Sequence, residues 1–154
     1  MKEKELQIST SLQIGKSPEQ VFEAIVEPKH MKNYFISESS GRMKVGISVN
    51  WKFDELNTLF PVEITGMEAN RYISFNWEGT EGETQKVEIF LEERQNGNTL
   101  VTIKEGNMPV TEKGIKWLKN NTEGWANFLA CLKAYLEFGI NLRKGGYDFY
   151  KDNR

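Results

Sequence analysis

The sequence predicts an α+β fold in which a curved antiparallel β-sheet wraps around a long C-terminal α-helix, with two short helices after the first strand. Apolar and polar residues alternate over residues 6–14 and again over about 37–106, which is typical of strands with one dry and one wet face. Apolar residues then recur every three or four positions over 111–138, as in an amphipathic helix. Short turns join the alternating segments, so we expect a meander of antiparallel strands.

The N-terminal part is expected to form a strand followed by two short helices. Residues 6–14 alternate as in a half-buried strand. Ser17, Pro18 and Gln20 have the spacing of a capping box with proline at the first helical position, so a helix is predicted to begin there. Pro28 should end this helix, because a proline disfavours helical backbone in the residue before it. A second short helical turn is expected directly afterwards.

The middle of the chain is expected to fold as consecutive strands joined by tight turns. The alternation over 45–53 predicts one of these strands, and four more follow before residue 106. Asn96-Gly97 indicates a two-residue hairpin turn, because both residues readily adopt positive φ. Ala69-Asn70 and residues 79–82 are expected to form the other turns.

The last third of the chain predicts a long helix that packs on the dry face of the sheet. Asn120 and Glu123 are spaced so that they could cap a second helix, but we favour one nearly continuous helix over 111–138. Gly139 is the expected C-terminal stop. Polar residues 143–154 should fray. The apolar stripe of the helix is expected to consist of Ile115, Leu118, Trp125, Leu129, Leu132 and Leu136.

Composition excludes several classes of protein. The 154 residues correspond to about one domain, which we place at residues 1–142, followed by the polar tail 143–154. A formal net charge of −2 lacks the basic footprint of a nucleic-acid-binding protein. A single cysteine and a single histidine exclude an intramolecular disulfide and a Cys/His zinc site, and we expect no metal. Without a phosphate-cradling glycine loop we also expect no cofactor.

The chain is expected to be cytoplasmic. Its first residues, Met1 to Glu5, lack the apolar core of a secretory signal peptide. No apolar run approaches the roughly 18 residues that a membrane-spanning helix needs.

Aromatic residues are unusually abundant, with 9 Phe, 5 Tyr and 4 Trp. On the dry face they predict either a filled core or an apolar cavity, and the sequence leaves both open. If a cavity exists, its expected ligand-binding residues are Val49, Trp51, Phe53, Val62, Ile64, Phe75, Trp77, Val87, Ile89, Leu91, Trp125, Leu129, Leu132 and Leu136. Arg71 and Gln85 fall on the same alternating positions as the inward-facing apolar residues of their strands. They therefore either hold the polar end of a ligand or simply lie at strand ends.

We expect no catalytic residues. Cys131 lies beside the apolar stripe of the last helix, where a buried thiol behaves as a small hydrophobic group. His30 falls in a polar stretch that reads as a surface turn, without a Ser or Asp in a recognisable triad context.

Motifs in sequence order give the chain a resemblance to a known family. It resembles the START-like, helix-grip (SRPBCC) superfamily, and within it the group named for the C-terminal domain of the activator of heat-shock-protein 90 ATPase. The resemblance covers about residues 5–139. It rests on Ser17 to Phe22, Glu27-Pro28, Tyr34-Phe35, Val45-Gly46, Val62 to Ile64, Arg71 to Trp77, and Gly124-Trp125 with Leu129, Leu132, Leu136 and Glu137.

This resemblance implies three functions. Members of the superfamily enclose a cavity that binds lipids, sterols or polyketides, so we expect a non-catalytic domain that binds a small apolar or amphipathic ligand. A co-chaperone that contacts a heat-shock-protein 90 type ATPase is the first alternative, although the eukaryotic activator carries a further N-terminal domain. A cyclase or dehydratase is the second. The ligand and the oligomeric state do not follow from the sequence.

Overall fold

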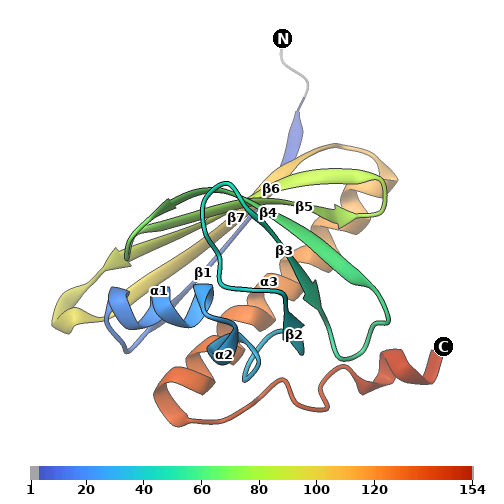
Figure 1. Cartoon of the computed structure of the whole chain (residues 1–154). Helices are drawn as coiled ribbons and strands as arrows, with labels where there is room; N and C mark the ends of the chain where they lie inside the picture. Colours follow the sequence, from blue (N-terminus) through green and yellow to red (C-terminus); the bar gives the residue numbers. More distant parts are fainter. Residues whose placement is uncertain (1–3, 154) are drawn as a thin grey trace.

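The computed structural model describes residues 4–153, and within them the strands form one seven-stranded antiparallel sheet in the order β1-β7-β6-β5-β4-β3-β2. The long helix α3 and the short helices α1 and α2 lie on one side of this sheet (Figure 1). The predicted α+β fold, a curved sheet around a long C-terminal helix, is confirmed. The elements are β1 (Glu5–Ile14), α1 (Pro18–Val26), α2 (Pro28–Met31), β2 (Glu38–Ser39), β3 (Ser48–Lys52), β4 (Leu59–Glu68), β5 (Tyr72–Thr80), β6 (Glu83–Glu93), β7 (Thr99–Pro109) and α3 (Glu112–Phe138), with short 3-10 turns at Gln95–Gly97 and Asp148–Asn153.

Local sequence signals position the start of α1. The Ser17 hydroxyl accepts a hydrogen bond from the Gln20 backbone N–H at 3.2 Å, and the Gln20 side chain accepts one from the Ser17 N–H at 3.3 Å. This is the predicted capping box, and Pro18 is the first helical residue. Pro28 begins α2 directly after the single non-helical residue Glu27. The prediction of two short helices is therefore confirmed.

The turns of the sheet use the residues that the sequence indicated. Asn96 and Gly97 both have positive φ, at 64° and 76°, and Asn70 has a φ of 65°. The predicted two-residue turn at Asn96-Gly97 was too short, because the last paired residues are Glu93 and Thr99 and a 3-10 turn at Gln95–Gly97 lies between them. The strands β3 to β7 pair with their neighbours in sequence order, which confirms the meander, and β1 pairs with β7. One strand boundary differs from the prediction. β3 begins only at Ser48, because Gly46 turns the chain with a φ of 86° and leaves Val45 exposed before the strand.

Helix α3 is continuous over 27 residues, as the sequence favoured. The Thr111 hydroxyl caps its first turn by accepting a hydrogen bond from the Gly114 N–H at 3.0 Å, and Gly139 ends it in the left-handed conformation. The expected stripe was wrong at its first position, since Ile115 is 46% exposed while Trp117 is buried. Gly114 permits the close approach of this turn to the end of β7, because a Cβ there would lie 2.1 Å from the Pro109 carbonyl oxygen.

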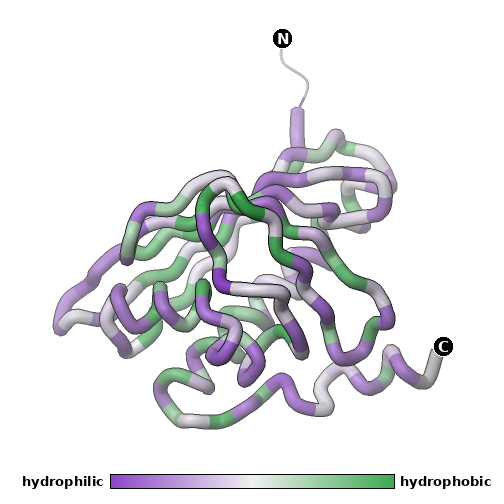
Figure 2. The backbone as a smooth tube through the Cα atoms, viewed as in Figure 1, coloured by the Kyte–Doolittle hydropathy of each residue, from purple (hydrophilic) through white to green (hydrophobic). Residues whose placement is uncertain are grey.

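The hydrophobic core lies between α3, α1 and the inner face of the sheet. Figure 2 shows hydrophobic and hydrophilic positions mixed along the longer strands, as expected for a sheet with one dry face. Helix α2 and the residues after it close the core on one side, where Tyr34 stacks on Tyr135 and contacts Phe128 edge-on. None of the helices in the described part of the chain is long and apolar enough to cross a membrane.

The segment after α3 differs from the expected fraying tail. It turns back beneath α3 and runs toward the loop between β3 and β4 (Figure 1). Arg143 forms an ion pair with Glu55 in that loop, and Lys151 forms one with Asp54. Nothing in the local sequence signalled these contacts, because the partners are far apart in the chain.

Candidate functional site

A cavity of about 220 Å³ lies between α3, the end of β5, the loop after β3 and the C-terminal segment. The dry face is thus not completely filled by side chains. Aromatic rings form most of the cavity wall, contributed by Phe35, Phe53, Phe60, Trp77, Trp125, Phe128 and Tyr147. Near Asn120, Gly124 and Asn127 of α3, which are exposed, the cavity reaches the surface. A space bounded by rings in this way suits an apolar ligand.

Ring-to-ring contacts hold the aromatic wall in place. Phe35 packs edge-on against Phe53 and Phe128, with centroid separations of 5.1 and 4.7 Å. Trp125 continues this cluster, with its ring 5.4 Å from that of Phe128 and 5.5 Å from that of Trp77. Edge-on contacts of this kind are the preferred geometry of aromatic pairs. The wall is therefore packed in a defined arrangement before any ligand enters.

A buried carboxylate, Glu105 on β7, orients the indole side of the wall. It accepts hydrogen bonds from the ring N–H groups of Trp125 at 2.8 Å, Trp77 at 3.1 Å and Trp117 at 3.5 Å. The side-chain amide of Asn121 donates to it at 3.2 Å. All of these groups are neutral donors, and both carboxylate oxygens are used. Glu105 therefore fixes Trp77 and Trp125 from behind the cavity wall, without lining the cavity itself.

Gly79 is required where β5 passes this carboxylate. A Cβ at position 79 would lie 2.1 Å from Oε2 of Glu105. The Gly79 carbonyl also accepts a hydrogen bond from the Asn121 amide at 2.8 Å. Strand β5 and helix α3 are thus joined at the mouth of the cavity by one amide that contacts both Gly79 and Glu105.

An ion pair forms the polar end of the cavity. The Arg143 guanidinium donates two hydrogen bonds to the Glu55 carboxylate, at 3.0 and 2.9 Å. The Glu55 side chain is only 8% exposed and that of Arg143 16%. The guanidinium also lies over the rings of Phe53 and Tyr147, at 5.3 and 4.4 Å from their centroids. This end of the cavity can therefore meet the polar group of an amphipathic ligand.

The remaining reactive groups have structural partners or lie away from the cavity. Burial raises the pKa of the Cys131 thiol, partly offset by Arg143, so this lining residue is a protonated thiol at neutral pH. His30 contacts the Tyr135 hydroxyl through Nδ1 at 2.6 Å, outside the cavity lining. In residues 4–153 no group of three or more potential metal-ligating side chains lies together.

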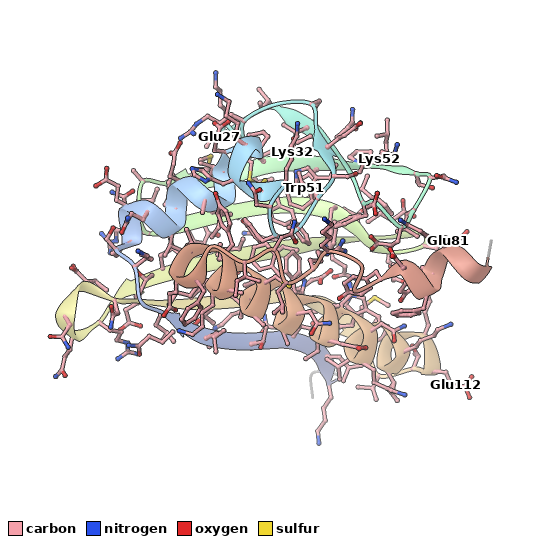
Figure 3. The ribbon with its side chains drawn as sticks, turned by 90° about the horizontal axis from the view of Figure 1, so that it is seen from below. Glu27, Lys32, Trp51, Lys52, Glu81 and Glu112 are labelled. Carbon is pink, nitrogen blue, oxygen red and sulfur yellow. The ribbon has the colours of Figure 1, made fainter. Side chains whose placement is uncertain are left out.

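One buried polar atom stands out next to the cavity. Among the described residues, the ring N–H of Trp51 on β3 is buried without a hydrogen-bond partner. Trp51 packs against Phe35 and Trp77, which line the cavity, and lies among the side chains between sheet and helix (Figure 3). Trp51 itself forms the layer behind that wall.

The structure brings part of the predicted set of ligand-binding residues to the cavity. Phe53, Trp77 and Trp125 line it. Arg71 lies exposed in a turn and pairs with Glu68, and Gln85 is buried opposite Trp77 on β6. The other predicted residues do not line the cavity and belong to the core: Val49, Trp51, Val62, Ile64, Phe75, Val87, Ile89, Leu91, Leu129 and Leu132 are buried, and Leu136 is half-buried. Whether any of them contacts a ligand stays a prediction.

Sequence reasoning missed lining residues of two kinds. Phe60 lies on the same face of β4 as the buried Val62 and Ile64, and Phe128 follows Trp125 by three residues on α3. The periodicity of the sequence could therefore have indicated both. Glu55 and Arg143 gave no such signal, because one lies in a loop and the other beyond the helix, 88 residues apart. Only the folded chain shows that they meet.

A sheet that grips one long helix over an aromatic cavity defines the START-like, helix-grip class of domains. Within this class, the chain belongs to the family described as activator of Hsp90 ATPase homolog 1-like protein, whose model matches residues 16–137. The resemblance inferred from the sequence is thereby confirmed. No curated protein matches the chain.

Solved structures show the same fold. An X-ray structure of a protein from Staphylococcus saprophyticus is 33% identical, with a TM-score of 0.78 over 90% of this chain and 96% of that one. The solution structure of the Aha1 dimer from Colwellia psychrerythraea is 22% identical, with a TM-score of 0.73 over 87% and 98%. DynU16, from the dynemicin biosynthetic locus, is 21% identical, with a TM-score of 0.76 over 88% of this chain and 48% of that one. The last two similarities show the fold alone.

Proposed function

We propose that this protein binds a small apolar or amphipathic ligand in the cavity beside α3, without transforming it chemically. The observation that carries this proposal is an open space of about 220 Å³ walled by aromatic rings that pack against one another. Protein cores are normally close-packed with few voids larger than a water molecule. Phe53, Trp77 and Trp125 are the proposed ligand contacts from the sheet side and the helix. A cytoplasmic location is part of this proposal.

Cavity size restricts the ligand class. An apolar cavity of about 150 Å³ holds benzene, whereas pockets for drug-sized ligands span roughly 300–1,000 Å³. The present cavity, at about 220 Å³, lies between these values. A body of one or two rings, or a short branched alkyl group, fits this volume. The Glu55–Arg143 pair would face the polar end of such a ligand.

Gly124 on α3 offers a direct test, because it lines the cavity and a Cβ there meets no atom within 4 Å. Gly124→Leu should fill the space and weaken binding of the neutral fluorescent probe N-phenyl-1-naphthylamine by at least about tenfold, since the ligand's apolar contacts are lost. The measurement is a fluorescence titration, together with native mass spectrometry of the freshly purified protein to reveal a co-purified ligand.

Two variants serve as controls for this experiment. Ala126→Leu adds the same side chain at an exposed position of α3 outside the cavity lining, and Gly124→Ala adds only a methyl group. Both should bind the probe as the unaltered protein does. The absence of saturable binding by the unaltered protein, for the probe and for a panel of lipids, would refute the proposal.

A second candidate function is regulation of a heat-shock-protein 90 type ATPase. It is favoured by the family to which the chain belongs and by the fold shared with the Colwellia Aha1 protein. The test adds increasing amounts of this protein to the cognate chaperone and follows its ATPase rate. A rate that stays constant up to saturating protein would exclude this function.

A further inference from the structure

The C-terminal segment, residues 140–151, passes beside the cavity, and we propose that it is a strap that controls the cavity's size and access. In the observed state the strap is latched by the Glu55–Arg143 ion pair and divides one longer groove into two pockets. Release of the latch joins them. This inference rests on the proposed function, because it concerns access to the same binding site.

The first step of the argument is a second pocket on the other side of the strap. This outer pocket has a volume of about 430 Å³, and most of its lining residues are polar, among them Lys32. Phe35, Glu55, Arg143 and Tyr147 line both the outer pocket and the aromatic cavity. These residues therefore form the partition between the two spaces, and Arg143 and Tyr147 belong to the strap.

The strap is fastened at several points to the elements around the cavity. Besides the two Glu55–Arg143 hydrogen bonds, the Tyr147 hydroxyl accepts a hydrogen bond from the Asn127 amide of α3 at 2.8 Å. Farther along, the Lys151 ammonium pairs with Asp54 at 2.9 Å. The strap thus connects α3 with the loop that follows β3, and the Arg143 contact is the most buried of these.

The strap's other contacts suit a part that opens locally. The backbone hydrogen bonds identified beyond the helix cap close turns within it, such as Gly146 N–H to the Arg143 carbonyl at 2.8 Å. Its residues Ile140 and Leu142 are 53% and 54% exposed, so the strap buries little apolar surface. Segments with few buried apolar contacts open at much lower free energy than the whole fold. The side-chain contacts of Arg143 and Tyr147 therefore dominate the closed state.

Cys131 provides a reporter of opening that needs no ligand. It is the only cysteine of the chain, it lines the cavity, and its thiol is buried close to Arg143. The experiment measures the rate at which N-ethylmaleimide alkylates Cys131 in the full-length protein, followed by intact-mass spectrometry. Opening of the strap exposes the thiol and increases this rate.

Arg143→Gln removes the latch and should accelerate alkylation at least about tenfold, because a bidentate ion pair of low exposure is lost. Glu55→Gln combined with Arg143→Gln leaves no unpaired charge and should show the same acceleration. Arg42→Gln is the matched control, since Arg42 makes a similar bidentate pair with Glu23 outside both pockets. Its alkylation rate should equal that of the unaltered protein.

Sub-denaturing urea separates strap opening from global unfolding. Local opening exposes little surface, so the accelerated rate should change little with urea, whereas a steep urea dependence would show that the variants merely unfold and would overturn the proposal. Unchanged alkylation in both latch variants would overturn it as well.

N-phenyl-1-naphthylamine should protect Cys131 from alkylation in the unaltered protein. If neither this probe nor any lipid of the panel binds, the proposed function is refuted, but the alkylation rates of the variants still test the strap.

Discussion

Glu105 shows how one residue can determine the shape of a cavity that it does not line. Burying a carboxylate is costly unless hydrogen bonds replace its hydration. Here the replacements are the ring N–H groups of Trp77, Trp117 and Trp125 and the amide of Asn121. Each of those donors would itself need a partner when buried. One carboxylate thus accepts the hydrogen bonds of several large buried side chains and sets their orientation.

Glu105→Gln is expected to lower the free energy of unfolding by about 2 kcal/mol or more, because charge-assisted hydrogen bonds are lost and an amide N–H₂ now faces donors. Urea denaturation followed by circular dichroism measures this change. Tryptophan fluorescence should shift at the same time, since Trp77 and Trp125 lose their fixed partner. Glu63→Gln, at an exposed position of β4, should change stability by no more than about 0.5 kcal/mol. Equal effects of the two substitutions would contradict the role assigned to Glu105.

At the scale of elements, the end of α3 is docked onto the corner between β1 and α1. The Glu137 carboxylate accepts a hydrogen bond from the Gly15 N–H at 3.0 Å and pairs with Lys133 one turn earlier. The Lys133 ammonium also donates to the Gln13 carbonyl at 3.1 Å. The hydrogen bond from Lys133 lowers the pKa of Glu137 below its ordinary value of 4.5. These contacts hold the C-terminal end of α3 against the end of β1.

Glu137→Gln is expected to reduce stability by about 0.5–1 kcal/mol at pH 7, since a partly exposed ion pair is lost. A carboxyl whose pKa is lowered by folding stabilises the fold above its unfolded pKa and loses this effect as the pH falls through the folded value. The difference between the two proteins should therefore be full at pH 7 and shrink below about pH 4.5. Denaturation curves between pH 3 and pH 7, with the exposed Glu123→Gln as control, measure it. A difference that grows toward low pH would contradict this assignment.

The periodicity of the sequence predicted where helices and strands lie better than it predicted which of their residues are buried. The capping residues Ser17 and Thr111 and the stop at Gly139 act within one turn of chain, so the sequence alone could locate both ends of α3 and the start of α1. The face of α3 at its first turn depends instead on contact with β7. There Gly114 lies against the Pro109 carbonyl, and in the same turn Trp117 is buried and Ile115 is exposed.

At the scale of the whole molecule, the hydrophobic core and the strap are separate layers. Buried and half-buried core residues extend from Leu6 to Leu136, so the core is complete before the strap begins. Outside this core, the strap forms the ion pairs Arg143–Glu55 and Lys151–Asp54 with the loop after β3. Residues 140–151 therefore belong to the proposed binding site, although the sequence assigned most of them to a polar tail.

A shortened chain that ends at Gly139 and carries Glu55→Gln is expected to fold. Because the core cluster stays intact and no unpaired buried carboxylate remains, its stability should fall by no more than about 2 kcal/mol. Urea denaturation should show one cooperative transition with a slightly smaller slope. The loss of a cooperative transition would show that the strap is part of the folding core.

The fold class, the order of the elements, the start of α1, the end of α3 and the inward faces that carry Phe53, Trp77 and Trp125 could all be predicted from the sequence. These properties follow from patterns that repeat within a few residues, which is the range over which backbone propensity and periodicity act. The cavity beside the dry face could be found only from the folded chain, because packing density depends on how facing elements fit. The folded chain also decided that Glu105 gathers the indoles and that Arg143 reaches Glu55, because hydrogen-bond partners distant in sequence are chosen by the folded geometry alone.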